Sequence, residues 1–199
     1  MNTRPLSVLF FGSQGAGKGT QVKLLMEFLK KRESERGIIH IDMGQELRNL
    51  RDIGSYAGRL TGQTIDAGGL MPDFMPTYLQ TKKLVENLVT GEEHVIADGL
   101  ARGADQTRAF DDAMTYFGRD DFQVVSIELS EAFVIQRLLA RGRNDDTEDA
   151  IRRRLAWTKT NVMPQLTLLK ERGRTVHVID GEPDMDTIHK NILSALKLV

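Results

Sequence analysis

Residues 7–20 read SVLFFGSQGAGKGT and decide the fold. The first five, with only Ser7 polar, form a mostly continuous apolar run, which is typical of a strand in a parallel sheet covered on both faces. The segment from Gly12 to Lys18 fits the pattern G-x-x-x-x-G-K, in which backbone N–H groups curl around a phosphate. A helix beginning near Gly19 would turn its positive dipole end toward the same phosphate. The sequence therefore predicts a strand, a phosphate-binding loop (P-loop) and a helix in succession.

Four more apolar runs predict strands, over residues 37–41, 94–97, 123–129 and 175–179. Stretches of helical periodicity predict helices over 19–34, 73–88, 104–117, 131–140, 147–172 and 185–198. Strands that alternate with helices imply right-handed crossovers. We therefore expect an α/β fold, with a doubly wound five-stranded parallel sheet and helices on both faces. Pro164 falls inside one predicted helix and should kink it.

Two segments interrupt this alternation. Residues 42–71 join the second strand to the next long helix and hold short helical pieces. Several glycines should break those pieces, namely Gly44, Gly54, Gly58, Gly62 and Gly68. Residues 140–147, ARGRNDDT, form a short charged loop between two helices. We expect residues 1–199 to fold as one domain, with a mobile insertion over 42–71 and a short lid over 140–147.

Composition excludes several classes of protein. Lys and Arg number 27 against 28 Asp and Glu, so the net charge of -1 does not favour binding to nucleic acid or to a membrane surface. The chain has no cysteine, which excludes a disulfide scaffold and a thiolate nucleophile or metal site. The apolar run near the N-terminus is too short for a signal peptide. We expect a monomeric cytoplasmic protein.

A second phosphate site is predicted in residues 96–106, IADGLARGADQ. Asp98 ends a predicted strand, so its carboxylate should lie near the P-loop, where it can hold Mg²⁺ through water. Arg102 can bind a phosphate with two parallel hydrogen bonds. The Gln106 amide can pair with the edge of an adenine.

Arginines are concentrated in residues 137–154, where they are Arg137, Arg141, Arg143, Arg152, Arg153 and Arg154. Acidic residues lie close by, so a solvated surface of ion pairs is one interpretation. Phosphoryl transfer between two nucleotides is the other, because it gathers several negative charges in one cleft. The P-loop and Arg102 favour the second interpretation.

On these residues the chain resembles the adenylate kinase family of nucleoside monophosphate kinases. GSQGAGKGTQ (12–21) is similar to the P-loop of that family, and Asp98, Gly99, Arg102 and Gln106 match its DGFPRT...Q motif. ARGRNDDTEDAIRRRL (140–155) resembles the short-lid form. Pro is usual where Gln14 stands, and Leu100-Ala101 replaces Phe-Pro. A cis bond before Ala101 would cost about 2.5–4 kcal/mol, so we expect a trans bond there.

The resemblance implies reversible phosphoryl transfer from Mg-ATP to AMP, giving two ADP. It assigns ATP binding to Gly15, Ala16, Gly17, Lys18, Gly19, Thr20, Arg137, Arg141 and Gly181. It assigns AMP binding to Met43, Arg48, Gly69, Leu70, Met71, Gly99, Arg102, Gln106, Arg143 and Arg154. The catalytic residues that it implies are Lys18, Arg102, Arg141, Arg143 and Arg154. Mg²⁺ would be held by Asp98 through water.

Two alternatives stay open at this point. Met43 stands where adenylate kinases have Thr, and a thioether cannot donate the hydrogen bond that a hydroxyl gives to a base. A kinase for another monophosphate, such as CMP, UMP or dAMP, is therefore one alternative. The altered loop at Leu100-Ala101 motivates the other, a nucleotide-binding regulator without catalytic activity.

Overall fold

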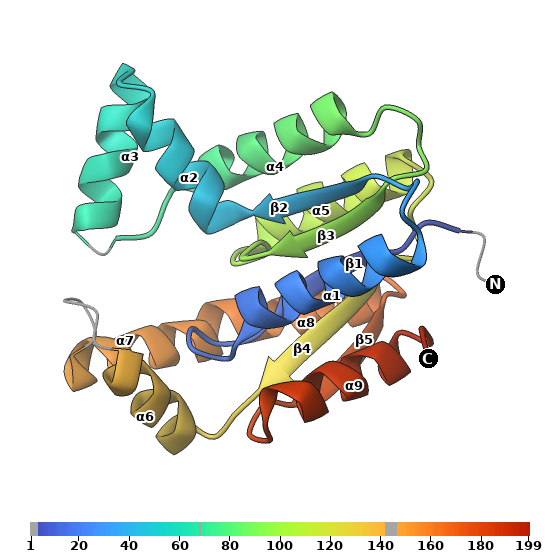
Figure 1. Ribbon diagram of the computed structural model, residues 1–199. Coiled ribbons are helices and arrows are strands. Elements are labelled where there is room, and N and C mark those ends of the chain that lie inside the picture. The colour runs from blue at the N-terminus through green and yellow to red at the C-terminus, as the bar shows by residue number, and fades with distance from the viewer. Residues whose placement is uncertain (1–3, 68, 142–146) are drawn as a thin grey trace.

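The computed structural model describes residues 4–67, 69–141 and 147–199, without the side chain of Arg141. Its centre is a parallel five-stranded sheet in the order β2-β3-β1-β4-β5 (Figure 1). The strands are β1 (Ser7–Phe11), β2 (Ile38–Asp42), β3 (His94–Asp98), β4 (Gln123–Glu128) and β5 (Thr175–Asp180). The predicted fold class is confirmed, and every predicted strand is present to within two residues at each end.

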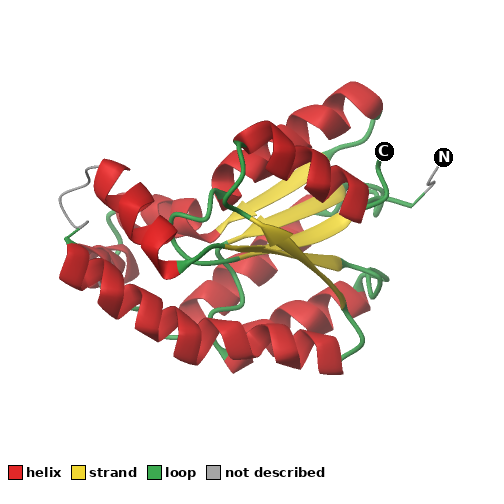
Figure 2. Cartoon of the chain, turned by 90° about the horizontal axis from the view of Figure 1, so that it is seen from below, coloured by secondary structure: helices red, strands yellow, loops and turns green. Residues whose placement is uncertain are grey.

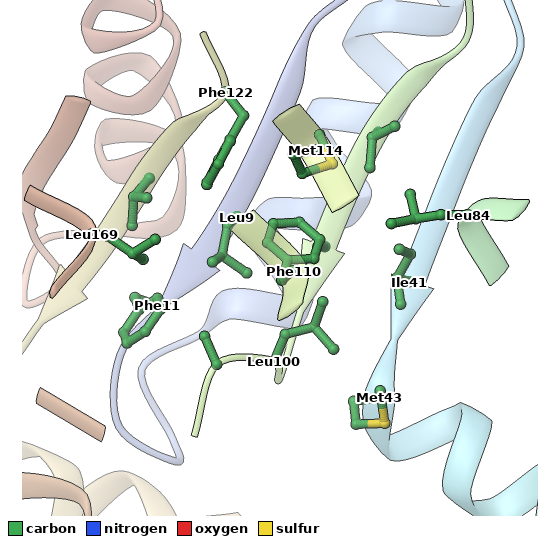
Figure 3. Packing of buried hydrophobic residues seen from close by; sticks show 14 of the residues in the cluster. Leu9, Phe11, Ile41, Met43, Leu84, Leu100, Phe110, Met114, Phe122 and Leu169 are labelled. Atoms are coloured by element: carbon green, nitrogen blue, oxygen red, sulfur yellow. The ribbon is translucent and has the colours of Figure 1, made fainter. Parts of the chain in front are cut away.

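Helices cover both faces of the sheet (Figure 2). One face packs against α4 (Phe74–Asn87), α5 (Ala104–Tyr116) and α8 (Met163–Glu171), through a cluster that contains Leu84, Phe110 and Leu169 (Figure 3). The other face packs against α1 (Lys18–Arg32) and α9 (Met185–Ala195), where Leu25 and Ile192 are fully buried.

The central strand β1 supplies both clusters. Leu9 and Phe11 belong to the first cluster, while Val8 and Phe10 belong to the second. Because successive side chains of a strand point to opposite faces, a strand covered on both sides must be apolar throughout. This is why residues 8–11 form one uninterrupted hydrophobic run, while the buried Ser7 accepts a hydrogen bond from Arg119.

The insertion after β2 contains α2 (Met43–Asp52) and α3 (Tyr56–Asp66). Gly54, with a φ of +75°, lies between them. Gly44, Gly58 and Gly62 lie inside these helices, so the expectation that they would break them was wrong. A Cβ at Gly58 would lie 2.5 Å from the carbonyl oxygen of Leu50, and one at Gly62 would lie 3.0 Å from the side chain of Arg51. These glycines allow α3 to pack closely on α2. Gly68 lies outside the described residues.

The helix predicted over 147–172 is divided. It consists of α7 (Glu148–Trp157), a π-helical turn η1 (Thr158–Val162) and α8, and it follows α6 (Glu131–Arg141). Pro164 stands in the first turn of α8 and has no N–H to donate to the preceding turn. The N–H of Met163 donates instead to Thr158, five residues earlier, which widens the helix. The structure therefore has a π-turn immediately before Pro164, where the sequence predicted a kink.

Candidate active site

The P-loop lies between β1 and α1. Gly12, Gly15 and Gly17 have φ values of 136°, 85° and 85°, which L side chains rarely adopt. At Gly12 a Cβ would also lie 2.4 Å from the carbonyl oxygen of Ile127 on β4. Gly17 is the N-cap of α1 and carries no side chain that could cap it. The first N–H groups of α1 are therefore available to an anion, together with the positive end of the helix dipole.

Lys18 folds back over this loop. Its ammonium group donates to the carbonyl oxygens of Gly12 and Ser13, both at 2.9 Å. Burial lowers the pKa of Lys18, whereas the negative charge of Asp98 opposes that shift. A half-buried ammonium next to a glycine-rich loop can form charge-assisted hydrogen bonds with a phosphate group.

Asp98 ends β3 and faces the start of α1. A Cβ at Gly19 would lie 4.0 Å from its Oδ2. Its Oδ1 is buried and has no hydrogen-bond partner among the described residues. Burial raises the pKa of Asp98, and the charge of Lys18 opposes this.

An oxygen with a free lone pair at this place fits Mg²⁺, which prefers hard oxygen ligands. In the described part of the chain, no group of three or more His, Cys, Asp or Glu residues could hold a metal ion. Such an ion would therefore take most of its ligands from water and phosphate, as Mg²⁺ usually does.

Arg102 lies beside the same strand end. Its Nε donates to the carbonyl oxygen of Gly99 at 3.1 Å. Although the residue is exposed, the surrounding protein desolvates the guanidinium and lowers its pKa, while the charges of Asp98 and Asp42 oppose that shift. Asp42 is paired with Asp98 in the register of β2 and β3, so two carboxylates and one guanidinium share this edge of the sheet.

The loop before Arg102 has a conformation of its own. The peptide bond before Ala101 is trans, as predicted, and Ala101 has a φ of 54°. Proline cannot adopt this angle, because its ring fixes φ near about −65°. Leu100 and Ala101 are 2% and 0% exposed, so they also fill the core beneath the site.

Gln106 lies in the first turn of α5 and is 4% exposed. Its Oε1 accepts from the backbone N–H of Arg102 at 3.3 Å, and its Nε2 donates to Asp73 at 2.8 Å. The structure thus brings Gln106 and Arg102 together. Asp73 was not among the predicted site residues, because its contact with Gln106 joins positions 33 residues apart.

The other residues predicted for AMP lie on or beside the insertion. Met43 begins α2, is only 3% exposed and belongs to the core cluster, at whose edge Figure 3 shows it. Arg48 is also on α2, and its Nε and Nη2 donate to Gln45 at 3.3 and 3.0 Å. Gly69 and Leu70 follow α3 and are exposed, and Met71 is half-buried. Of these residues, Arg48 and Leu70 present side chains to solvent, whereas the Met43 side chain packs inside the protein.

The predicted lid is only partly described. Arg143 and the side chain of Arg141 lie outside the described residues. Arg137 on α6 has its guanidinium 4.8 Å from the centre of the Phe133 ring. Arg154 on α7 is half-buried, and its Nε donates to Ala150 at 3.3 Å. Figure 1 shows α6 and α7 at the carboxyl ends of the strands, on the side opposite α2 and α3.

Arg152 pairs with Glu148 at 2.8 Å and with Glu131 at 2.9 Å on the surface of α7. Gly181 follows β5, and its N–H donates to Glu128 at 2.8 Å. A Cβ at Gly181 would lie 2.7 Å from the Ile127 side chain, so the turn at this strand end requires glycine.

Within the described residues, no helix has the length and apolar character needed to cross a bilayer.

The family model described as "Adenylate kinase" matches residues 10–174. An adenylate kinase of Maricaulis maris is 32% identical over 196 residues, covering 96% of this chain and 99% of its own. An adenylate kinase of Prochlorococcus marinus is 33% identical over 192 residues, covering 96% of this chain and 97% of its own. "Adenylate kinase 1" of a Synechocystis strain is 30% identical over 190 residues and covers 96% of both chains.

Proposed function

The chain belongs to the adenylate kinase family of phosphotransferases, and from this premise we propose that it transfers a phosphoryl group from Mg-ATP to AMP at the carboxyl ends of β1 and β3. This location of the reaction is supported by the group that Lys18, Asp98 and Arg102 form at this edge of the sheet. A half-buried ammonium, a carboxylate oxygen without a partner among the described residues and a guanidinium lie beside the P-loop.

On the donor side, the ATP phosphates would occupy the loop from Gly15 to Thr20. The backbone N–H groups at the start of α1 and the Lys18 ammonium would neutralise their charge. Arg137, Arg141 and the turn at Gly181 would contact the rest of ATP. When bound, Mg²⁺ would neutralise the charge of neighbouring phosphates, and Asp98 would hold it through water.

On the acceptor side, Arg48 and Arg102 would bind the monophosphate. Gln106 would face the base, and Gly69, Leu70 and Met71 would line its pocket. A phosphate monoester has a second pKa of about 6, so the attacking oxygen is already ionised at neutral pH. The protein therefore needs no general base, and it contributes by positioning the two phosphates and excluding water.

We propose further that residues 42–71 and 140–147 close over the two nucleotides. Arg141, Arg143 and Arg154 would then reach the transferring phosphoryl group. We also propose that the chain acts as a cytoplasmic monomer, and the absence of cysteine is compatible with a reducing compartment. Light scattering during gel filtration tests the monomer, because a dimer would elute with twice the mass.

The central experiment is one assay with purified protein, Mg-ATP and a panel of AMP, dAMP, CMP and UMP, in which ADP is measured. We expect the highest kcat/KM with AMP. Preferred transfer to a pyrimidine would identify a kinase for another monophosphate. Nucleotide binding without any transfer would overturn the proposed reaction.

A further inference from the structure

The side-chain amide of Gln106 is held from both ends. Its Nε2 donates to Oδ1 of Asp73 at 2.8 Å, and its Oε1 accepts from the backbone N–H of Arg102 at 3.3 Å. The backbone is fixed too, because the carbonyl oxygen of Gln106 accepts from Gln80 at 3.2 Å. Asp73 precedes α4 and Gln80 lies on it, so one helix anchors both the backbone and the side chain of Gln106.

These contacts determine which way the amide points. A carboxylate can only accept, and a backbone N–H can only donate. Reversing the amide would place its oxygen against the Asp73 carboxylate and its NH₂ group against the Arg102 N–H. Both contacts would then be repulsive. The two neighbours thus select one orientation of a group that could otherwise turn over.

Two features around Asp73 favour its contact with the Gln106 amide. Aspartate at an N-cap commonly bonds to the first turn of its helix. The Asp73 side chain makes no such bond within the described part of the chain and reaches α5 instead. The space that it occupies depends on Gly103, where a Cβ would lie 2.7 and 3.0 Å from the two carboxylate oxygens. A side chain at position 103 would displace the carboxylate.

We propose that Asp73 is a positioning residue that makes the acceptor site select a 6-aminopurine over a 6-oxopurine. This rests on the proposed function, in which Gln106 faces the acceptor base. In the selected orientation, the amide retains one N–H and one oxygen lone pair. They match a ring nitrogen that accepts and an exocyclic amino group that donates, as in adenine. Hypoxanthine presents the opposite pattern, a carbonyl oxygen beside an N–H, and would need the reversed amide.

The test is the ratio of kcat/KM for AMP to kcat/KM for IMP. Asp73→Ala should lower this ratio about tenfold, while KM for ATP stays within twofold of the wild type. Asp73→Asn retains an acceptor oxygen and should restore most of the ratio. The matched control is Asp105→Ala, which removes an exposed carboxylate one residue before Gln106 and should leave the ratio unchanged. Thermal unfolding of each variant shows whether it is folded.

Gln106→Ala separates failure of this inference from failure of the proposed function. If Gln106→Ala lowers the ratio and Asp73→Ala does not, the role of Asp73 is overturned and the acceptor site stands. If neither variant changes the ratio, the placement of the base at Gln106 is itself overturned. If both lower it, adding Asp73→Ala to Gln106→Ala should have no further effect. A further fall would show that Asp73 acts independently of the amide.

Discussion

The Lys18 ammonium donates a hydrogen bond to the carbonyl oxygen of Gly12 at 2.9 Å, across the mouth of the loop that joins them. The loop backbone thus fixes the position of its own charged side chain. A charge that is already oriented stabilises a developing anion without the cost of reorganisation, which is the main way in which enzymes lower barriers by electrostatics.

Replacing Lys18 tests this arrangement. Lys18→Met keeps most of the aliphatic side chain and removes the charge, so we expect kcat to fall about 100-fold or more. The measurement is ADP formation at saturating ATP and AMP. Lys23→Met, on the exposed side of α1, is the control and should retain wild-type activity. Turnover at the wild-type rate in Lys18→Met would remove Lys18 from the mechanism.

Asp98 should control the Mg²⁺ requirement. Asp98→Asn keeps the shape of the side chain but loses the negative charge that favours a cation. We expect kcat/KM to fall about 10-fold to 100-fold, with more Mg²⁺ needed for half-maximal rate. A Mg²⁺ titration of the reaction measures both, and chelation by EDTA should abolish transfer. An unchanged titration curve would show that Asp98 does not act on the metal. Asp66→Asn, on the exposed part of α3, provides the comparison.

The arginines of α7 should differ in their effects. Arg154 is half-buried, whereas Arg152 is exposed and bridges Glu148 and Glu131. Arg154→Ala should lower kcat/KM at least about tenfold, because in the proposed reaction its charge would stabilise the transferred phosphoryl group. Arg152→Ala should change it less than about twofold, as expected for a surface ion pair. We expect Arg143→Ala to behave like Arg154→Ala. Equal changes in kcat/KM for all three variants would indicate that these arginines form solvated surface ion pairs and do not bind nucleotide.

An acidic residue far from the site should make stability depend on pH. Asp111 is fully buried and accepts from both Arg172 and Arg174. Burial alone would raise the pKa of Asp111, but the two guanidinium groups hold it below its usual value. A lowered pKa in the folded state stabilises the protein above the unfolded pKa of about 4, and this is lost as the pH falls through the folded value.

Asp111→Asn should therefore reduce the free energy of unfolding by about 3 kcal/mol at pH 7, because two guanidinium groups lose their carboxylate. The difference from the wild type should shrink below about pH 4. Urea denaturation at pH 7 and pH 3 measures it. The control is Asp112→Asn, which removes an exposed partner of Arg172 and should cost much less. A difference that persists unchanged at pH 3 would contradict the assignment.

The strands and the P-loop could be predicted because their signals are local. A covered strand must be apolar throughout, and a phosphate loop needs glycine at fixed positions beside one lysine. Lys18, Asp98 and Arg102 follow from those patterns, since parallel strands end at one edge of the sheet. Gly58 could not be placed inside a helix, because glycine usually weakens helices and its reason here is a distant contact: a Cβ would lie 2.5 Å from the Leu50 carbonyl oxygen.

The remaining features could not be predicted, because they depend on contacts between positions far apart in the sequence. Pro164 indicates a local interruption, but it does not indicate that the interruption is a π-turn with the Met163 N–H bonded to Thr158. The partner of the Gln106 amide is separated from it by a whole helix, and no spacing in the sequence indicates that Asp73 would reach it. Propensity and motif describe neighbours along the chain, whereas these features arise from neighbours in space.

The place of β1 in the sheet has a consequence for biosynthesis. This strand is made first, yet it lies between β3 and β4, and Val8 is aligned with Ile96 on one side and with Gln123 on the other. A nascent chain that ends before Gln123 has no partner for one edge of β1, whose residues 8–11 are all apolar. Until β4 leaves the ribosome, that edge is open to pairing with other chains, so the hazard of aggregation is greatest midway through translation.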